Sequence, residues 1–136
     1  MTQTRTASRQ ITGEVTSWPG IESGIGSRGE FGFRLGRREI GHLHGDRVAH
    51  FSLPKAVWAE LMEAGRIVPH SVFPDAQGPA ARWIHDEADV LDVIALLRLN
   101  YDRQVARHGL PSDAEPRGTH AVWFSCLAYR PSSSIA

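Results

Sequence analysis

The sequence contains a single cysteine, Cys126, among its 136 residues. One cysteine cannot form a disulfide within the chain, and a zinc site built from several cysteines is excluded as well. The longest apolar run, residues 121–129, falls well short of the roughly 20 residues that a membrane-spanning helix needs, and it contains Ser125. The basic residues Arg5 and Arg9 are not followed by an apolar segment, so we expect no signal peptide.

The formal net charge of the chain is zero, because 15 lysine and arginine residues balance 15 aspartate and glutamate residues. A nucleic-acid-binding domain normally carries a basic stripe, and a protein held electrostatically at a membrane carries a basic patch. The sequence therefore predicts neither nucleic acid nor a membrane as a partner. Because no disulfide can form within the chain, a reducing cytoplasm is the expected compartment.

The chain is long enough for one domain with a modest hydrophobic core. Hydrophobic periodicity predicts three helices and five extended segments. In chain order these are a helix at 6–17, strands at 31–35, 38–44 and 48–53, a helix with Pro54 at its first position, extended residues 66–73, a strand at 80–85 and a long helix before Gly109. This order, α-β-β-β-α-β-β-α, predicts an α+β fold with an antiparallel sheet and helices packed mainly on one face.

Two segments lie outside these elements. The glycine-rich residues 24–29 are interpreted as a flexible turn, because the Lys-Ser/Thr ending and the following helix of a phosphate-binding loop are missing. We assign residues 1–109 to the folded domain, and residues 110–136 to a connector and an aromatic C-terminal tail. The tail could add an edge strand, cover a groove or pack on a second subunit.

Three of the seven histidines, His42, His44 and His50, lie within nine residues. Alternation places His42 and His44 on one face of their strand, and the facing of His50 depends on the turn between the strands. A three-residue turn at 45–47 pairs His42 with His50 and gathers Leu43 with other apolar side chains on the opposite face. A two-residue turn mixes polar and apolar side chains on both faces. We therefore predict that the three imidazoles share one face.

Three interpretations of this histidine face stay open. The histidines could be polar residues on a partly solvated sheet face, they could line a metal-free functional pocket, or they could bind a metal ion. Neighbouring imidazoles repel one another when protonated, so burial, mutual hydrogen bonds or a metal must favour their neutral forms. Two histidines on one strand and a third on its partner suit zinc, iron or manganese, although the sequence requires no cofactor.

Other residues complete the predicted pocket. His70 could close it as a base or fourth ligand, or could cap a strand end. Ile40 shares the alternation of His42 and is placed in the pocket. Trp83 could stack on a planar ligand or be buried in the core, and Asp75 could orient a histidine or serve a turn. The candidate catalytic residues are thus His42, His44, His50 and His70, of which the first three are also the candidate metal ligands.

Several motifs, taken in order, resemble the luciferase-domain family, which is named after the luciferase of bioluminescent fungi. They are Glu39-Ile-Gly-His-Leu-His-Gly-Asp46, Phe51-Ser-Leu-Pro-Lys55, Glu63-Ala-Gly-Arg-Ile-Val-Pro-His70, Asp86-Glu-Ala-Asp-Val90 and Leu96-Leu-Arg-Leu-Asn-Tyr101. The resemblance extends over residues 11–107. The fungal enzyme is similar at the His-x-His pair and at histidines that match His50 and His70.

For the fungal member, this resemblance implies addition of oxygen to a pyrone-type luciferin. That substrate is not carried over, because the present chain is shorter and has a different tail. The resemblance implies a pocket with oxygenase-like or metal-assisted chemistry, in which histidines hold a planar, enolate-like substrate or accept its proton.

The alternative is a non-catalytic module that binds a partner, or forms a homodimer, through the sheet edge and the tail. The two functions differ in the geometry that they need. An enzyme needs a concave, partly buried histidine site, whereas the module needs a flat, exposed histidine face and an apolar patch near Val122, Phe124 and Leu127.

Overall fold

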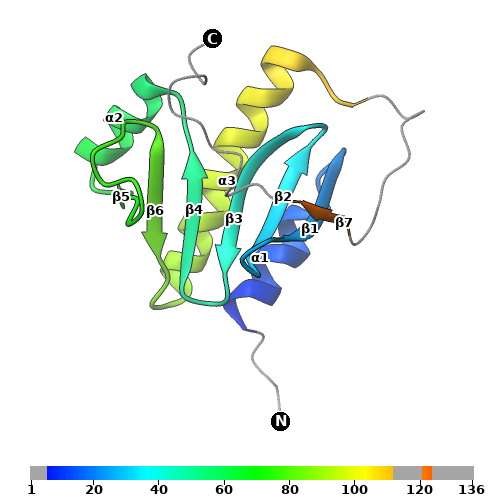
Figure 1. Cartoon of the computed structure of the whole chain (residues 1–136), viewed down its shortest axis with the longest axis horizontal. Helices are drawn as coiled ribbons and strands as arrows, with labels where there is room; N and C mark the ends of the chain where they lie inside the picture. The colour runs from blue at the N-terminus through cyan, green and yellow to red at the C-terminus, as the bar shows by residue number, and fades with distance from the viewer. Residues whose placement is uncertain (1–5, 112–120, 124–136) are drawn as a thin grey trace.

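The computed structural model of the chain describes residues 6–111 and 121–123. Its elements, in chain order, are α1 (Ala7–Val15), β1 (Ile21–Gly26), β2 (Phe31–Leu35), β3 (Arg38–His44), β4 (Val48–Ser52), α2 (Lys55–Glu63), β5 (Val68–Pro69), β6 (Pro79–Trp83), α3 (Glu87–His108) and β7 (Ala121–Trp123). Figure 1 shows them as a sheet with helices, so the predicted α+β fold is confirmed. The structure adds β1 and β7 to the predicted order.

Within the described residues the sheet has seven strands in the order β5-β6-β4-β3-β2-β1-β7 (Figure 1). The strands from β5 to β1 pair antiparallel with their neighbours, whereas β7 joins the free edge of β1 in parallel. Residues 121–123 thus take the first of the three roles expected for the tail, that of an edge strand. Phe124 and Leu127 lie outside the described residues.

The glycine-rich segment differs from its prediction as a turn. Gly24 lies within β1 and pairs with Gly32 of β2, and only the residues after Gly26 form the turn. Gly26 lacks a side chain for a packing reason, because a Cβ atom there would lie 2.0 Å from Oε2 of the fully buried Glu30. Gly26 therefore allows a close approach within a strand, whereas Gly29, with a φ of 83°, lies in the turn.

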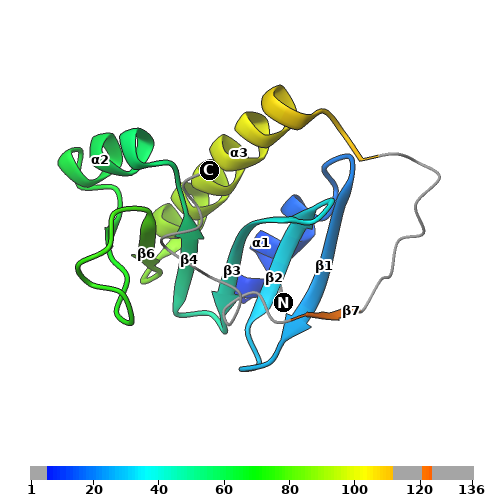
Figure 2. The ribbon, with the colours of Figure 1, turned by 45° about the horizontal axis from the view of Figure 1, so that its top comes forward.

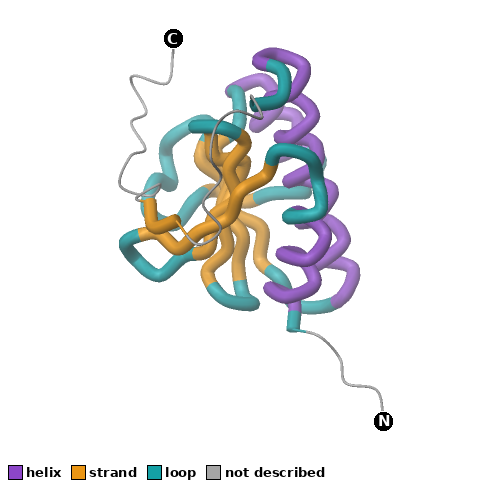
Figure 3. Tube along the Cα trace, turned by 90° about the vertical axis from the view of Figure 1, so that its right-hand side faces the viewer, coloured by secondary structure: helices purple, strands orange, loops and turns teal. Residues whose placement is uncertain are grey.

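The hydrophobic core lies between the sheet and the helices α1 and α3, which cover the same face (Figure 3). Phe33, Leu43 and Phe51 contribute to it from three strands. Leu97 of α3 comes so near to β3 that a Cβ atom on Gly41 would lie 2.5 Å from its Cδ2. This packing leaves the other face of β3 and β4 to polar side chains.

The helix α3 is held at both ends and along one side. Asp86 caps its N-terminus by accepting a hydrogen bond from the N–H of Asp89, and Gly109, with a φ of 74°, follows its last residue. Arg82 of β6 forms ion pairs with Asp89 and Asp92, at 2.7 and 2.8 Å. These contacts fix α3 to β6, and the helix ends before Gly109 as predicted.

The predicted helix is present as α2, but Pro54 is its N-cap and Lys55 is its first residue. Trp58 on this helix donates a hydrogen bond from Nε1 to the carbonyl oxygen of Pro79 at 3.1 Å. Figure 2 shows α2 and its connection to β6 at the end of the sheet away from β1. No helix of the described part of the chain is both long and apolar enough to cross a membrane.

Candidate functional site

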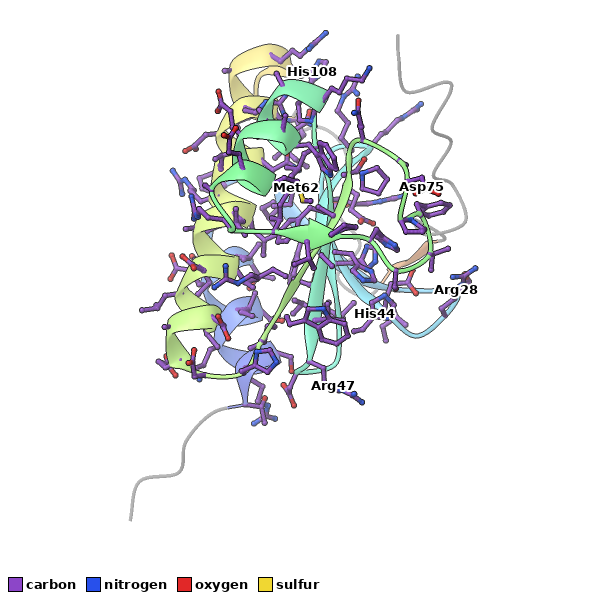
Figure 4. The ribbon with its side chains drawn as sticks, turned by 90° about the vertical axis from the view of Figure 1, so that its left-hand side faces the viewer. Arg28, His44, Arg47, Met62, Asp75 and His108 are labelled. Carbon is purple, nitrogen blue, oxygen red and sulfur yellow. The ribbon has the colours of Figure 1, made fainter. Side chains whose placement is uncertain are left out.

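The turn between β3 and β4 sets the direction of the histidines. Gly45 in this turn has a φ of 61°, a left-handed conformation that suits glycine. The ladder pairs His42 with His50 and His44 with Val48. The predicted three-residue turn is therefore confirmed. Figure 4 shows the labelled His44 on the side of the sheet opposite to α3, and the register places His42 and His50 on the same side.

The three imidazoles lie against one another. The ring centroids of His42 and His44 are 5.1 Å apart, those of His42 and His50 are 5.2 Å apart, and those of His44 and His50 are 4.7 Å apart. Nδ1 of His50 lies 3.3 Å from Nε2 of His42. His42 and His50 are buried and His44 is half-buried. This geometry differs from the flat, exposed histidine face that the non-catalytic alternative needs.

His70 reaches the cluster from the far edge of the sheet. It follows β5, and its ring centroid lies 3.9 Å from that of His50. Its Nδ1 accepts a hydrogen bond from the N–H of Val72 at 3.1 Å. A ring nitrogen that accepts a hydrogen bond carries no proton, so neutral His70 has its proton on Nε2. In this tautomer Nε2–H of His70 is free to act as a hydrogen-bond donor, and it offers no lone pair to a cation.

Glu39 is a site residue that alternation did not predict. Its Oε2 lies 2.6 Å from Nδ1 of His42. In a regular strand, residues three apart face opposite sides, which would place Glu39 toward the core. A β-bulge changes this, because Phe33 pairs with Gly41 but Arg34 pairs with Glu39. A glycine inside a predicted strand, here Gly41, was the sequence feature that indicates such a bulge.

The prediction that Ile40 lines the pocket is wrong. Because of the same bulge, its side chain is fully buried in the hydrophobic core. Its carbonyl oxygen accepts a hydrogen bond from Nδ2 of Asn100 at 3.0 Å. Asp75 is exposed in the loop between β5 and β6, outside the residues that line the cavity (Figure 4). Trp83 is 44% exposed and lines the cavity, so it is a pocket residue rather than a core residue.

The cluster opens into a cavity of about 640 Å³ that all four histidines line. On the β1–β3 side the cavity is lined by basic side chains, which are those of Arg28, Arg34, Arg37 and Arg38. On the β5–β6 side it is lined by large apolar side chains, which are those of Val72, Phe73 and Trp83. Glu39 is the only acidic residue among the described residues that line it. The imidazoles thus lie between a basic and an apolar wall.

Burial and proximity keep these imidazoles neutral. Burial, reinforced by the charges of His70, His42 and His44, lowers the pKa of His50 to about 3. Burial, reinforced by His42 and His44, lowers the pKa of His70 to about 4. The pKa of His44 is lowered as well, first by burial and then by His42. At pH 7 these three rings therefore offer lone pairs rather than positive charge.

The arrangement has two chemical capabilities. His42, His44 and His50 each present a ring nitrogen, and these atoms lie within 4.8 Å of one another, as donors to one cation would. The contacts from Glu39 to His42 and from His42 to His50 also form a continuous chain for proton transfer. Both capabilities depend on Glu39, because its carboxylate fixes the proton of His42 on Nδ1.

The segment that contains this site matches a known protein family. Residues 37–100 match the family model described as the luciferase domain. No curated protein and no solved structure matches the chain. The matched segment runs from the start of β3 into α3 and contains all four clustered histidines. Residues 37–100 of this chain belong to the luciferase-domain family.

Proposed function

We propose that the cavity binds a planar small molecule and that the chain is an oxygenase-like enzyme. The observation that carries this proposal is the convergence of His42, His44, His50 and His70 at one cavity, with three of the rings buried. A cavity on which a few polar side chains converge is the default candidate for a ligand site. Membership of the luciferase-domain family supports oxygen chemistry at that site.

The arginines indicate the charge of the ligand. Among the described residues, no carboxylate forms an ion pair with the guanidinium group of Arg28, Arg37 or Arg38. The cavity therefore has an excess of positive charge in a chain whose formal net charge is zero. Such a field attracts and orients an anion. The planar guanidinium group also matches the two oxygens of a carboxylate or an enolate-like group.

The apolar wall indicates the shape of the ligand. Val72 is 53% exposed and Trp83 is 44% exposed, and both line the cavity. Large exposed apolar side chains beside a cavity are typical of ligand contacts. An indole ring offers a flat surface on which another ring can stack. A ligand with a flat apolar body and one anionic end would satisfy both walls.

The histidines supply the proton acceptor that an enolisable ligand needs. The O–H bond of the enol breaks, its proton moves to a ring nitrogen of a neutral imidazole such as His44, and the electron pair stays on the ligand. The arginines then stabilise the enolate, and Nε2–H of His70 can donate to it. An electron-rich enolate is the form of such a molecule that reacts with oxygen.

The ligand class is tested with a matched pair of probes, 2-naphthoate and its neutral analogue 2-naphthamide. We expect the wild-type chain to bind the acid at least tenfold more tightly than the amide, and the double variant Arg37→Gln/Arg38→Gln to lose this preference. The physical reason is that only the acid gains from the positive wall. Isothermal titration calorimetry measures both affinities.

The control for this experiment is Arg98→Gln, because Arg98 pairs with Asp102 on α3 and does not line the cavity. It should keep the preference for the acid. Equal binding of acid and amide by the wild-type chain would contradict the proposed ligand. For enolisable acids that bind, oxygen consumption by the wild-type chain but not by His44→Gln is expected at an oxygen electrode.

A further inference from the structure

The donor atoms of the cluster also fit a cation. We propose that His42, His44 and His50 bind one divalent transition-metal ion of the Zn²⁺ type, and that Glu39 orients His42 for it. This site deepens the proposed function and rests on it for its role, since the metal would share the cavity with the organic ligand. The evidence for the metal site itself, however, comes from contacts among the side chains of the cluster.

The separations between the ring nitrogens are compatible with one bound metal ion. Two nitrogens bound to tetrahedral zinc at 2.0–2.1 Å lie about 3.3 Å apart. Nε2 of His42 and Nδ1 of His50 are 3.3 Å apart, and a cation between them would replace their hydrogen bond, with the proton of His50 moving to its Nε2. One ring nitrogen from each of the three histidines lies within 4.8 Å of the others. His44 is half-buried, so rotation of its ring can close the remaining gap. Three nitrogens leave one position that opens into the cavity, as in catalytic zinc sites.

Glu39 determines which ring nitrogen of His42 carries the proton. Because its carboxylate accepts the hydrogen bond, His42 has its proton on Nδ1 and directs the lone pair of Nε2 toward His50. A carboxylate behind a histidine is the usual partner of a metal-bound imidazole, since it fixes the tautomer and strengthens the ligand. The bulge that brings Glu39 to this face therefore serves His42 directly.

A metal-free proton relay is the competing explanation, and His44 distinguishes the two. The relay uses only Glu39, His42 and His50, whose contacts are hydrogen bonds. Within the described residues, no hydrogen bond reaches the ring of His44, although this ring lies 4.7 Å from that of His50. A shared cation would bind a ring nitrogen of all three histidines, whereas the relay leaves His44 only its proposed role as proton acceptor for the ligand. The nearby arginines repel a free cation, and Glu39 offsets part of that repulsion.

The experiment titrates Co²⁺ into the full chain after treatment with EDTA, and follows the visible absorption of tetrahedral cobalt. We expect one ion per chain, displaced by Zn²⁺. His44→Gln should lower the cobalt affinity at least tenfold, as should His42→Gln and His50→Gln. Glu39→Gln should lower it 10- to 100-fold and keep the shape of the spectrum, because the three ligands remain.

The matched control is His85→Gln, because the side chain of His85 is 77% exposed and lies outside the cavity. Its cobalt affinity should equal that of the wild-type chain. Circular dichroism of each variant establishes that it folds, and His44→Gln, the least buried of the three changes, keeps the test usable if the buried variants unfold. Absence of a tetrahedral cobalt spectrum in the wild type, or wild-type affinity in His44→Gln, would overturn the metal site.

The outcomes also separate the two proposals. If cobalt does not bind but 2-naphthoate is still preferred over 2-naphthamide, the metal site fails and the proposed ligand site stands. If cobalt binds with the expected dependence on His44 but the acid is not preferred, the ligand class fails and the metal site stands.

Discussion

Gly41 lies next to His42 and is constrained from the core side of the sheet. A Cβ atom at this position would lie 2.5 Å from Cδ2 of Leu97 and 3.1 Å from the carbonyl oxygen of His50. The helix α3 can approach β3 this closely only because glycine has no side chain. The same residue adjoins the bulge that brings Glu39 to His42. Packing of the core and alignment of the imidazole therefore depend on one residue.

Gly41→Ala is expected to lower the free energy of unfolding by about 1–3 kcal/mol, because the added methyl group overpacks the core. Gly13→Ala is the matched change, since Gly13 is exposed within α1 and alanine favours the helix by up to about 1 kcal/mol. Urea denaturation should show effects of opposite sign. Destabilisation of equal size by both substitutions would contradict the close approach of α3.

At the scale of elements, α3 organises the fold from behind the site. Its side chains Val93, Leu96 and Leu97 are buried in the core, and Asn100 bonds to the backbone of β3. Arg82 links its first turns to β6, the strand that also carries Trp83 into the cavity. Both strands that flank β4 are thus held by one helix, and the start of that helix depends on its cap.

Asp86→Ala is expected to lower the free energy of unfolding by about 1 kcal/mol, because the N–H of Asp89 loses its side-chain acceptor at the N-cap. Asp102→Ala should change it by less than about 0.5 kcal/mol, since the ion pair between Asp102 and Arg98 is exposed. Thermal unfolding followed by circular dichroism compares the two. Equal losses would show that the cap does not stabilise α3.

At the scale of the whole molecule, the buried histidines link stability to pH. His50 and His70 have a pKa of about 3 and about 4 in the folded chain, below the value of 6.5 that applies when the chain is unfolded. Between pH 6.5 and pH 4 the unfolded chain therefore binds more protons than the folded chain. Stability from these groups is complete above pH 6.5 and is lost as the pH falls.

For the metal-free chain in EDTA, we expect the free energy of unfolding to decrease from pH 7 to pH 4. Each of the two histidines adds a slope of up to about 1.4 kcal/mol per pH unit in this range, because the proton binds preferentially to the unfolded chain. Urea denaturation at several pH values measures the slope. A free energy that is constant over this range would show that the rings are not buried as neutral groups.

The sequence by itself determined the facing of His42, His44 and His50. Alternation within each strand and the length of the turn are local properties, and a register error would have exchanged apolar and polar faces. The start and end of α3 were also local, because Asp86 and Gly109 act within one turn of the helix. Such features follow from neighbouring residues and need no knowledge of the fold.

Only the tertiary structure decided which other residues join the histidines. The bulge opposite Arg34 brings Glu39 into the site and Ile40 into the core, and it arises from the pairing of two strands rather than from either one. The strand order β5-β6-β4 brings His70 to His50 and leaves Trp83 on the cavity. The physical reason is that pairing between distant segments is selected by burial across the whole sheet, a quantity that no short stretch of sequence contains.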